Sequence, residues 1–475
     1  MSDHGFVVGD YHERRLGGGH VALLGRRSRD WAVVSDPVAG LLRAVANGNS
    51  LPGVLQQDAA FGPVLKQLAA AGILLPSGPA AADDRQLRPP PTLLIKVTGA
   101  CNIACNYCYD YSEARWSGRI DLGLVCRTID SMIAQDPRLT VMFHGGEPLL
   151  AFRLVRDVVA HCEMRVRSGD VRIGYALQTN GLLLTDEIIQ FLTDHRFDVG
   201  LSLDGPRSIN DAGRKDHRGR GTFDRVMDQL GSHREFVTQR VGILAVVETN
   251  SRERLEEIFD FFATLGVSTL KLMGVHGGGR SDGVDDQGDA GFIDFLAAML
   301  ERIGRGEWSR PYLINLIELV DRFLSQEEGN ICMSRSCGAG REFLIIDAAN
   351  NLRACDITYD DAFLLTPADI ALTTPDPAGD ARASSNAQRL RAREQWLLRE
   401  SSCSECEWLS LCGGSCPGKA LMLNGSILGV DELECRTRKA IFPRILELLT
   451  ASDGHLLKYY TERHRSRSAA MSGGR

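Results

Sequence analysis

The stretch CNIACNYCYDY, residues 101–111, places three cysteines within eight residues, with no fourth cysteine or histidine close by. Structural zinc sites are usually closed by four ligands, and disulfide frameworks spread their cysteines through small secreted domains. Cys101, Cys105 and Cys108 therefore indicate a metal centre that keeps one coordination position open. The run TLLIKVT, residues 92–98, reads as a strand, so the three-cysteine loop follows directly on a strand end.

From residue 92 the chain alternates apolar, strand-like runs with amphipathic segments. The expected strands are TLLIKVT, LTVMFHG, VRIGYALQT, FDVGLSLDG, VGILAVVET and STLKLMGV. This alternation favours a parallel sheet with helical crossovers. Polar motifs such as HGGEP, QTNG and SLDGP end three of these strands, at the face where α/β barrels carry active sites. We expect an α/β fold with a partial (β/α)6 TIM-like barrel, although periodicity alone does not exclude a doubly wound sheet.

Length and charge set further bounds. A chain of 475 residues is too long for one ordinary domain, so two or three are expected. Its net charge of −7 gives no general basic field for nucleic acid. The start, MSDHGFVVGDYHERR, has no apolar signal core, and no run of eighteen apolar residues follows. We therefore expect a cytoplasmic protein with neither nucleic acid nor a membrane among its partners.

Residues 1–75 are expected to form a separate small unit. HVALLG and WAVVS predict a hairpin, and DPVAGLLRAVANG predicts a helix with Asp36 at its N-cap. FGPVLKQLAAAGILLP predicts a second helix that ends at Gly72, and a hairpin followed by helices is the outline of a winged helix. The remaining expected segments are a linker at 76–91, the barrel at 92–310, a cysteine-rich domain at 311–445, and a C-terminal helix with a disordered tail at 446–475.

The motif CxxxCxxC, with Tyr107 before its last cysteine and a barrel strand ahead of it, resembles the radical S-adenosylmethionine (radical SAM) superfamily. The resemblance implies that Cys101, Cys105 and Cys108 hold three irons of a [4Fe–4S] cluster. The open iron would chelate the amino and carboxylate groups of S-adenosylmethionine, whose one-electron cleavage yields a 5′-deoxyadenosyl radical.

Further residues match positions at which this family contacts S-adenosylmethionine. The GGEP motif would bring Glu147 to the ligand's ammonium group, although the same residues could simply begin a helix. Ser202 and Asp204 would meet the ribose hydroxyls or nearby groups, and Arg214 the carboxylate, although a polar turn would also explain them. The implied contact residues are Gly145, Gly146, Glu147, Pro148, Ser202, Asp204 and Arg214.

The C-terminal cysteines resemble a SPASM domain, which carries two auxiliary [4Fe–4S] clusters. Cys403 to Cys416 read CxxCx5CxxxC, and Asn350 stands where the family has a glycine, a turn that asparagine also tolerates. The family pattern assigns Cys332, Cys337, Cys355 and Cys416 to the first cluster, and Cys403, Cys406, Cys412 and Cys435 to the second. A pair of structural zinc sites is the alternative.

SPASM-type enzymes mostly modify peptides or proteins, and residues 1–75 resemble the element that binds a leader peptide as an added strand. We therefore expect oxidation, for example crosslinking, of side chains in a ribosomally made precursor peptide, with a reductant such as flavodoxin or ferredoxin as a partner. A sulfatase-type maturase that forms formylglycine is the rival, with Asp356 at that family's proton-acceptor position. A third possibility is an iron–sulfur electron carrier or peptide-binding scaffold.

Overall fold

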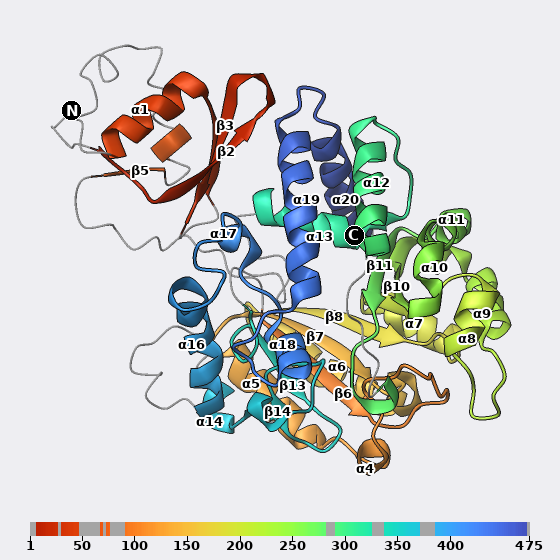
Figure 1. The fold of residues 1–475 in the computed structure, drawn as a ribbon. Helices are drawn as coiled ribbons and strands as arrows, with labels where there is room; N and C mark the ends of the chain where they lie inside the picture. Colours follow the sequence, from red (N-terminus) through yellow and green to blue (C-terminus); the bar gives the residue numbers. More distant parts are fainter. Residues whose placement is uncertain are drawn as a thin grey trace.

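The computed structural model describes residues 6–26, 30–46, 67–69, 73–76, 91–281, 290–324, 337–370 and 385–472. Its largest feature is a ten-stranded sheet in the order β12-β11-β10-β9-β8-β7-β6-β13-β14-β15 (Figure 1). The six strands from β6 to β11 are parallel neighbours, as the sequence predicts. They are β6 (Thr92–Thr98), β7 (Arg138–Gly145), β8 (Arg172–Thr179), β9 (Asp198–Ser202), β10 (Val241–Val247) and β11 (Thr269–Gly274).

The same sheet continues into the cysteine-rich part of the chain. β12 (Tyr312–Leu313) and β13 (Phe343–Ile346) pair in parallel with β11 and β6, one at each end of the six strands. β14 (Leu352–Arg353) and β15 (Leu364–Leu365) then extend one edge in antiparallel fashion. The boundary expected at residue 310 therefore does not divide the sheet, because its outer strands come from later residues.

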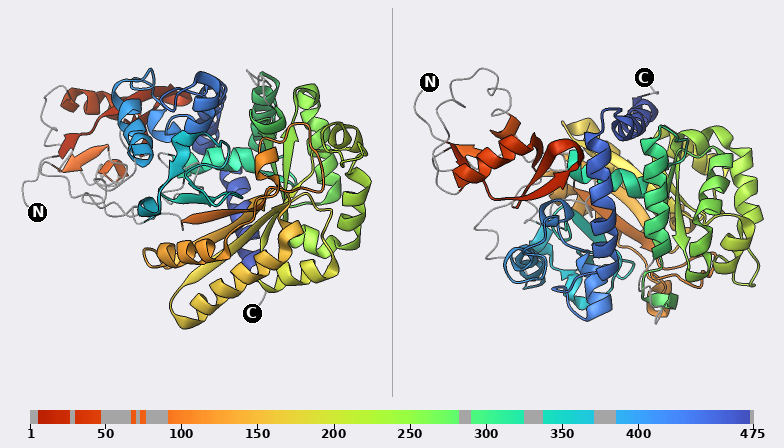
Figure 2. Two further views of the ribbon diagram at one scale, coloured as in Figure 1. Left: turned by 90° about the horizontal axis from the view of Figure 1, so that it is seen from below. Right: turned by 45° about the horizontal axis from the view of Figure 1, so that its top comes forward.

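Helices connect the parallel strands and lie along one side of the fanned sheet (Figure 2). The segment between β9 and β10 contains two helices divided at His233, and a further helix follows the three-cysteine loop. Asp121 caps that helix, because its side chain accepts a hydrogen bond from the Gly123 N–H at 2.8 Å. The helices are α5 (Leu122–Ile133), α6 (Phe152–Ser168), α7 (Asp186–Asp194), α9 (Phe223–Ser232), α10 (Arg234–Arg240) and α11 (Leu255–Leu265).

The two faces of the parallel strands differ in burial. In β7, Val141 and Phe143 are fully buried, whereas the residues between them are partly exposed, and β8 to β10 repeat this alternation. Successive side chains of a strand point to opposite faces of the sheet. In these strands the residues with odd numbers pack into the core, whereas the residues with even numbers form a second face that is partly exposed. We call this second face the lumen face. A Cβ at Gly200 would lie 2.0 Å from Gln178 Oε1, so the glycine makes room for a polar side chain there.

The N-terminal unit, meaning the described residues up to Pro76, contains a three-stranded sheet. β3 (His20–Gly25) and β4 (Trp31–Ser35) form the predicted hairpin, and α1 (Asp36–Ala46) follows as expected. β2 (Tyr11–Leu16) pairs with the other side of β3. This strand is not expected from the sequence, because YHERRL is mostly polar.

A second strand pair belongs to the N-terminal unit. β1 (Phe6–Val8) pairs in antiparallel fashion with β5 (Leu74–Pro76). Residues 67–69 are helical, whereas most of the helix expected to end at Gly72 lies outside the described residues. The unit thus contains strands that a hairpin followed by two helices does not have, and its likeness to a winged helix stays a prediction.

β3 is buried on both of its faces, and this attaches the N-terminal unit to the rest of the protein. Leu23 packs inside the unit, in a small core shared with α1, whereas Leu24 belongs to the main hydrophobic core. Trp31 Nε1 donates a hydrogen bond to the Phe323 carbonyl oxygen at 2.8 Å. The unit is therefore packed against the rest of the described chain through apolar contacts as well as hydrogen bonds.

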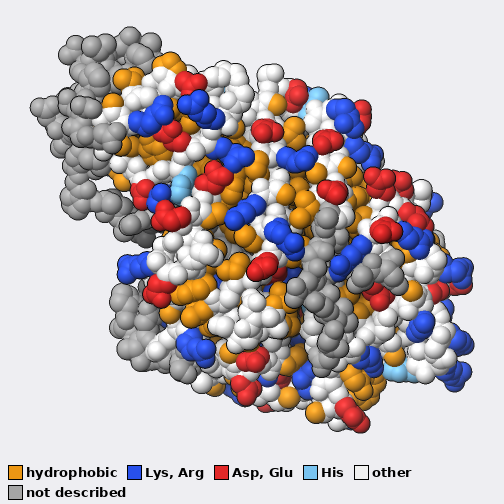
Figure 3. Space-filling model, in the orientation of Figure 1, with side chains coloured by type: hydrophobic (Ala, Val, Ile, Leu, Met, Phe, Trp, Pro, Cys, Tyr) orange, Lys and Arg blue, Asp and Glu red, His pale blue; other side chains and the backbone are white. Residues whose placement is uncertain are grey.

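The cysteine-rich part is mostly helical. Its last helix runs to Ser472, although its polar, basic residues were expected to be disordered. No helix in the described ranges is long and apolar enough to cross a membrane. Basic and acidic side chains are interspersed over the face in Figure 3. The helices are α12 (Ala290–Gly304), α13 (Ile314–Leu324), α16 (Ser385–Arg399), α17 (Leu409–Cys412), α18 (Pro417–Asn424), α19 (Glu432–Thr450) and α20 (His455–Ser472).

Candidate active site

The three-cysteine loop is held in place by backbone hydrogen bonds at the end of β6. The Ala104 N–H donates to the Lys215 carbonyl oxygen at 2.6 Å, and the Gly146 N–H donates to the Thr98 carbonyl oxygen at 2.8 Å. A Cβ at Gly146 would lie 2.1 Å from the Ala100 carbonyl oxygen, so only glycine fits this contact. The HGGEP motif therefore shapes the loop through its backbone.

The three thiols of this loop lie close together and are largely shielded from water. Burial raises the pKa of Cys101 to about 12 and that of Cys105 to about 11, and the neighbouring Cys108 thiol raises both further. Such thiols stay protonated at neutral pH unless a cation replaces the proton. Among the residues that the structure describes, no group of three or more His, Cys, Asp or Glu side chains converges as the ligands of one ion would. A [4Fe–4S] cluster fits this arrangement, because each thiolate binds its own iron.

Glu147 is fully buried, and its carboxylate is hydrogen-bonded by the chain itself. Oε1 accepts from the Leu149 N–H at 3.1 Å and the Thr179 hydroxyl at 2.9 Å, and Oε2 accepts from the Asn180 N–H at 2.8 Å. Burial raises the pKa of Glu147 to about 7, although these donors lower it. The carboxylate thus ties the end of β7 to the end of β8, and its contact with a ligand ammonium stays a prediction.

Asp204 and Arg214 are nearly buried and bind each other. Arg214 Nε and Nη2 donate to the two carboxylate oxygens at 2.9 and 3.0 Å. Asp204 also accepts from the Tyr107 hydroxyl and, at 2.9 Å, from the Val246 N–H, while Arg214 Nη1 lies 3.9 Å from Cys105 Sγ. The sequence predicts separate ligand contacts for the two side chains. The structure gives each an internal partner, and the ligand contacts stay predictions.

The ends of β8 and β9 contribute further polar groups. The Ser202 hydroxyl accepts a hydrogen bond from Gln178 Nε2 at 2.8 Å on the lumen face. Asn180 Nδ2 donates to Asn102 Oδ1 at 2.7 Å and lies 3.8 Å from Cys101 Sγ. Asn180 therefore touches the cysteine loop with its side chain, a contact that the QTNG motif signals only as a polar strand end.

Asp356 reaches the end of β6 from the segment after Cys355. The Tyr109 hydroxyl donates to Oδ2 at 3.0 Å, and Lys96 Nζ lies 2.8 Å from Oδ1 as an ion pair. That ion pair lacks hydrogen-bond geometry, so Oδ1 is buried without a hydrogen-bond donor among the described residues. Burial raises the pKa of Asp356, but Lys96 and His144 lower it more, to about 2. Asp356 is therefore ionised at neutral pH but only weakly basic beside Lys96, and its role as a proton acceptor stays a prediction.

Four C-terminal cysteines lie together near α17 and the start of α19. Burial raises the pKa of Cys435, and the thiols of Cys412, Cys403 and Cys406 raise it further. Arg438 Nη1 lies 3.0 Å from Cys412 Sγ. The structure therefore brings together the four residues assigned to the second auxiliary cluster, while their role as iron ligands stays a prediction.

The other auxiliary group is only partly described. Burial raises the pKa of Cys416 to about 12, and the neighbouring Cys337 thiol raises it further. Cys355 lies close to the same segment, because a Cβ at Gly418 would be 3.3 Å from Cys355 Sγ. Cys332 lies outside the described residues. Three of the four predicted ligands of this group are thus found in one region.

Asn350 adopts the left-handed conformation expected for the position where the family has glycine. Its φ is 66°. Its side chain accepts a hydrogen bond from the Asp121 N–H at 2.7 Å and donates to the Arg119 carbonyl oxygen at 2.9 Å. Glycine could not make these two bonds, so asparagine keeps the turn and adds a link to the segment before α5.

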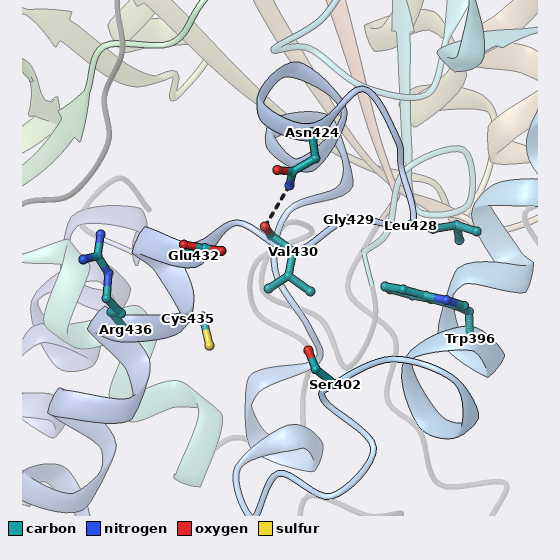
Figure 4. A pocket seen from close by; sticks show the side chains of 9 residues that line it. All are labelled: Trp396, Ser402, Asn424, Leu428, Gly429, Val430, Glu432, Cys435 and Arg436. Atoms are coloured by element: carbon teal, nitrogen blue, oxygen red, sulfur yellow. Dashed lines mark hydrogen bonds between the residues drawn. The ribbon is translucent and has the colours of Figure 1, made fainter.

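Two surface hollows flank the second cysteine group. One of about 460 Å³ has Cys435, Arg436 and Trp396 in its lining, as Figure 4 shows. The other, of about 530 Å³, is lined by residues that include Cys406 and Arg14. These hollows lie away from the three-cysteine loop and open beside the second cysteine group.

Comparison with known proteins identifies the class. Residues 95–262 match the Radical SAM superfamily, and this range contains the three-cysteine loop, GGEP and Arg214. Residues 95–262 thus form a radical SAM domain, and the chain is a radical SAM enzyme. This class implies a [4Fe–4S] cluster and S-adenosylmethionine, and it replaces the third possibility of a carrier or scaffold.

Several of the similar curated proteins are sulfatase-maturating enzymes. The serine-type anaerobic sulfatase-maturating enzyme of Klebsiella aerogenes is 28% identical over 352 residues, which cover 71% of this chain and 82% of that enzyme. The cysteine-type enzyme of Clostridium perfringens (strain 13 / Type A) is 25% identical and covers 69% and 89%.

Two solved structures have a similar fold. Histidine-tagged anSMEcpe with bound AdoMet has a TM-score of 0.63 at 21% identity, covering 77% of this chain and 100% of that chain. Streptococcus suis SuiB bound to precursor peptide SuiA has a TM-score of 0.50 at 15% identity, covering 91% and 100%. The chain is thus similar in fold to both kinds of enzyme.

Proposed function

We propose that this enzyme oxidises and crosslinks side chains of a ribosomally synthesised precursor peptide, which it recruits through a leader segment. The N-terminal unit carries this proposal, because β2 and β4 are the edges of its three-stranded sheet among the described strands. A sheet edge can accept an extended peptide as an additional strand. The fold match to SuiB over 91% of the chain cannot come from the residues after Pro76 alone, so it takes in part of this unit.

The proposed reaction divides its tasks among residues at the strand ends. Cys101, Cys105 and Cys108 would hold a [4Fe–4S] cluster, which would bind S-adenosylmethionine and supply the radical chemistry of this class. Asn180 and the GGEP backbone hold the loop that carries these thiolates. Crosslinking would remove two hydrogens from the peptide: one would pass as a hydrogen atom to the deoxyadenosyl group, and the other would leave as a proton accepted by Asp356 and an electron accepted by an auxiliary cluster.

The proposed auxiliary centres would accept that electron, and a reductant such as flavodoxin or ferredoxin would supply the electron for the initial cleavage. Their neighbouring thiols and the adjacent Arg438 guanidinium support the assignment to a SPASM-type domain. The proposed ligands are Cys332, Cys337, Cys355 and Cys416 for the first cluster, and Cys403, Cys406, Cys412 and Cys435 for the second.

The test compares a precursor peptide with and without its leader. The full-length enzyme is reconstituted anaerobically with iron and sulfide, reduced, and supplied with S-adenosylmethionine. The leader-bearing peptide should lose two hydrogens and resist fragmentation between the joined residues. Removing the leader should slow modification by about tenfold or more, because a tethered substrate reaches millimolar effective concentrations. Equal rates with and without the leader would show that no leader recruits the substrate.

Formylglycine formation is the second candidate, and the sulfatase-maturating relatives together with the buried Asp356 favour it. In this case a cysteine or serine of a sulfatase would become an aldehyde. A hydrazide reagent labels an aldehyde but not a carbon–carbon or carbon–heteroatom crosslink. Hydrazide labelling of a sulfatase peptide that has no leader, without any crosslinked precursor, would replace the first proposal with the second.

A further inference from the structure

Lys96 is an unusual residue for its position. It lies near the end of β6 between Ile95 and Val97, and its side chain is only 2% exposed. Lysine is almost never buried unless its charge is paired. A cation at this depth therefore requires partners that the strand itself does not supply.

Its partners come from two segments far apart in the sequence. Lys96 Nζ lies 2.7 Å from Asp110 Oδ1, 2.8 Å from Asp356 Oδ1 and 3.2 Å from the Asp356 carbonyl oxygen. Asp110 follows Cys108 by two residues, and Asp356 directly follows Cys355. One ammonium group thus contacts both the three-cysteine loop and the segment with a predicted auxiliary ligand.

Two tyrosines complete this contact and leave each carboxylate with little freedom. The Tyr109 hydroxyl donates to Asp356 Oδ2 at 3.0 Å, and the Tyr359 hydroxyl donates to Asp110. The Tyr359 ring also lies 4.5 Å from Lys96 Nζ. Each of the two segments therefore supplies one carboxylate and one tyrosine, and Lys96 is the group that both carboxylates share.

We propose that Lys96 is a positioning residue that fixes the Cys355–Asp356 segment against the three-cysteine loop by bridging Asp110 and Asp356. The bridge sets where Asp356 stands at the barrel mouth. The effect of this bridge on catalysis rests on the proposed function, whereas the existence of the bridge does not. A lysine is suited to this task, because its compact ammonium charge can pair with both carboxylates at once.

The first test measures stability and needs no substrate. In the full-length reconstituted enzyme, Lys96→Met should lower Tm by about 5 °C, because it leaves two buried carboxylates without their cation. The double variant Lys96→Met with Asp356→Asn should be no less stable than Lys96→Met alone, since Asp356 has already lost its partner. The matched control is Lys271→Met, because Lys271 on β11 forms an ion pair with Glu318 of α13. The Tm changes of Lys271→Met and Asp356→Asn should be additive in the double variant. If the Tm changes of Lys96→Met and Asp356→Asn are additive as well, the proposed bridge is wrong.

The second test separates positioning from cofactor cleavage. Lys96→Met should keep its iron content, its reduced-state EPR signal and its release of 5′-deoxyadenosine, while product formed per 5′-deoxyadenosine falls about tenfold or more. A wild-type ratio would overturn the positioning role. If Lys96→Met does not fold, Asp110→Asn tests the same bridge by removing the charge of its other carboxylate. A wild-type ratio of product to 5′-deoxyadenosine in Asp110→Asn would also overturn the positioning role. A wild-type enzyme inactive on every peptide would refute the proposed function and leave the stability test standing.

Discussion

Asp204 and Arg214 form a two-point ion pair with nitrogen–oxygen distances of 2.9 and 3.0 Å, and both side chains are nearly inaccessible to water. The same carboxylate accepts from Tyr107, and the same guanidinium lies beside Cys105. The SLDGP turn is thereby connected to two positions of the cysteine loop. The pair shapes the loop before any ligand arrives.

Asp204→Asn should therefore destabilise the chain strongly. It leaves the Arg214 guanidinium buried without a counter-charge, which costs about 3–5 kcal/mol for a buried pair. Denaturant unfolding measures the change. The control is Asp224→Asn, whose partner Arg207 is 59% exposed, and this substitution should have no measurable effect. Equal unfolding midpoints for the two variants would contradict a structural role for the pair.

Replacing Cys101, Cys105 and Cys108 together with alanine should remove one cluster. Three [4Fe–4S] clusters correspond to about twelve irons, so the triple variant should contain about eight. It should also lose cleavage of S-adenosylmethionine, measured as release of 5′-deoxyadenosine. The control Cys126→Ala, in α5 and outside every predicted ligand set, should keep the full iron content. Cleavage that survives in the triple variant would refute the assignment.

Glu147 should make stability fall with rising pH. Its pKa is about 7 in the folded chain and 4.5 as the ordinary value, so the folded state binds the proton more tightly between these values. The unfolding free energy therefore decreases as pH rises through this window. Urea unfolding at several pH values measures the slope, which Glu147→Gln should reduce. An unchanged slope in that variant would show that Glu147 does not titrate in this range.

Two substitutions of Asn350 separate the contribution of its backbone conformation to stability from that of its side-chain hydrogen bonds. Asn350→Gly keeps access to positive φ but loses two side-chain hydrogen bonds, which should cost about 2 kcal/mol. Asn350→Ala loses the same bonds and adds the strain of a left-handed residue, about 1–2 kcal/mol more. Chemical unfolding of both variants gives the difference. If alanine is tolerated as well as glycine, the turn carries no strain at this position.

The parallel strands and the cysteine loop could be predicted because their signals are local. The strand pattern repeats every second residue, and the three cysteines stand within one short loop. The role of Lys96 could not be predicted in this way. Inside TLLIKVT it resembles any single polar residue of a strand, and its partners lie 14 and 260 residues away.

The same limit applies to the short strands at the ends of the sheet and to buried side-chain pairs. β12, β14 and β15 have two residues each, too few to show any periodicity, so the extension of the sheet beyond residue 310 was missed. The charge of Arg214 is visible in the sequence and suggests a ligand contact, which stays a prediction, whereas its pairing with buried Asp204 is not visible there. Side-chain partners across a fold depend on packing, which a single sequence does not display.

Because β3 is buried on both of its faces, the N-terminal unit cannot simply be exchanged for that of a related enzyme. Leu23 faces the helix of its own unit, and Leu24 faces the enzyme body, where Trp31 also meets Phe323. A foreign N-terminal unit grafted onto this barrel would thus present an unmatched apolar surface to Phe323 and would expose it to water. Chimeras intended to accept a new leader should transplant the supporting residues of α13 together with the unit, or alter only the edge strands.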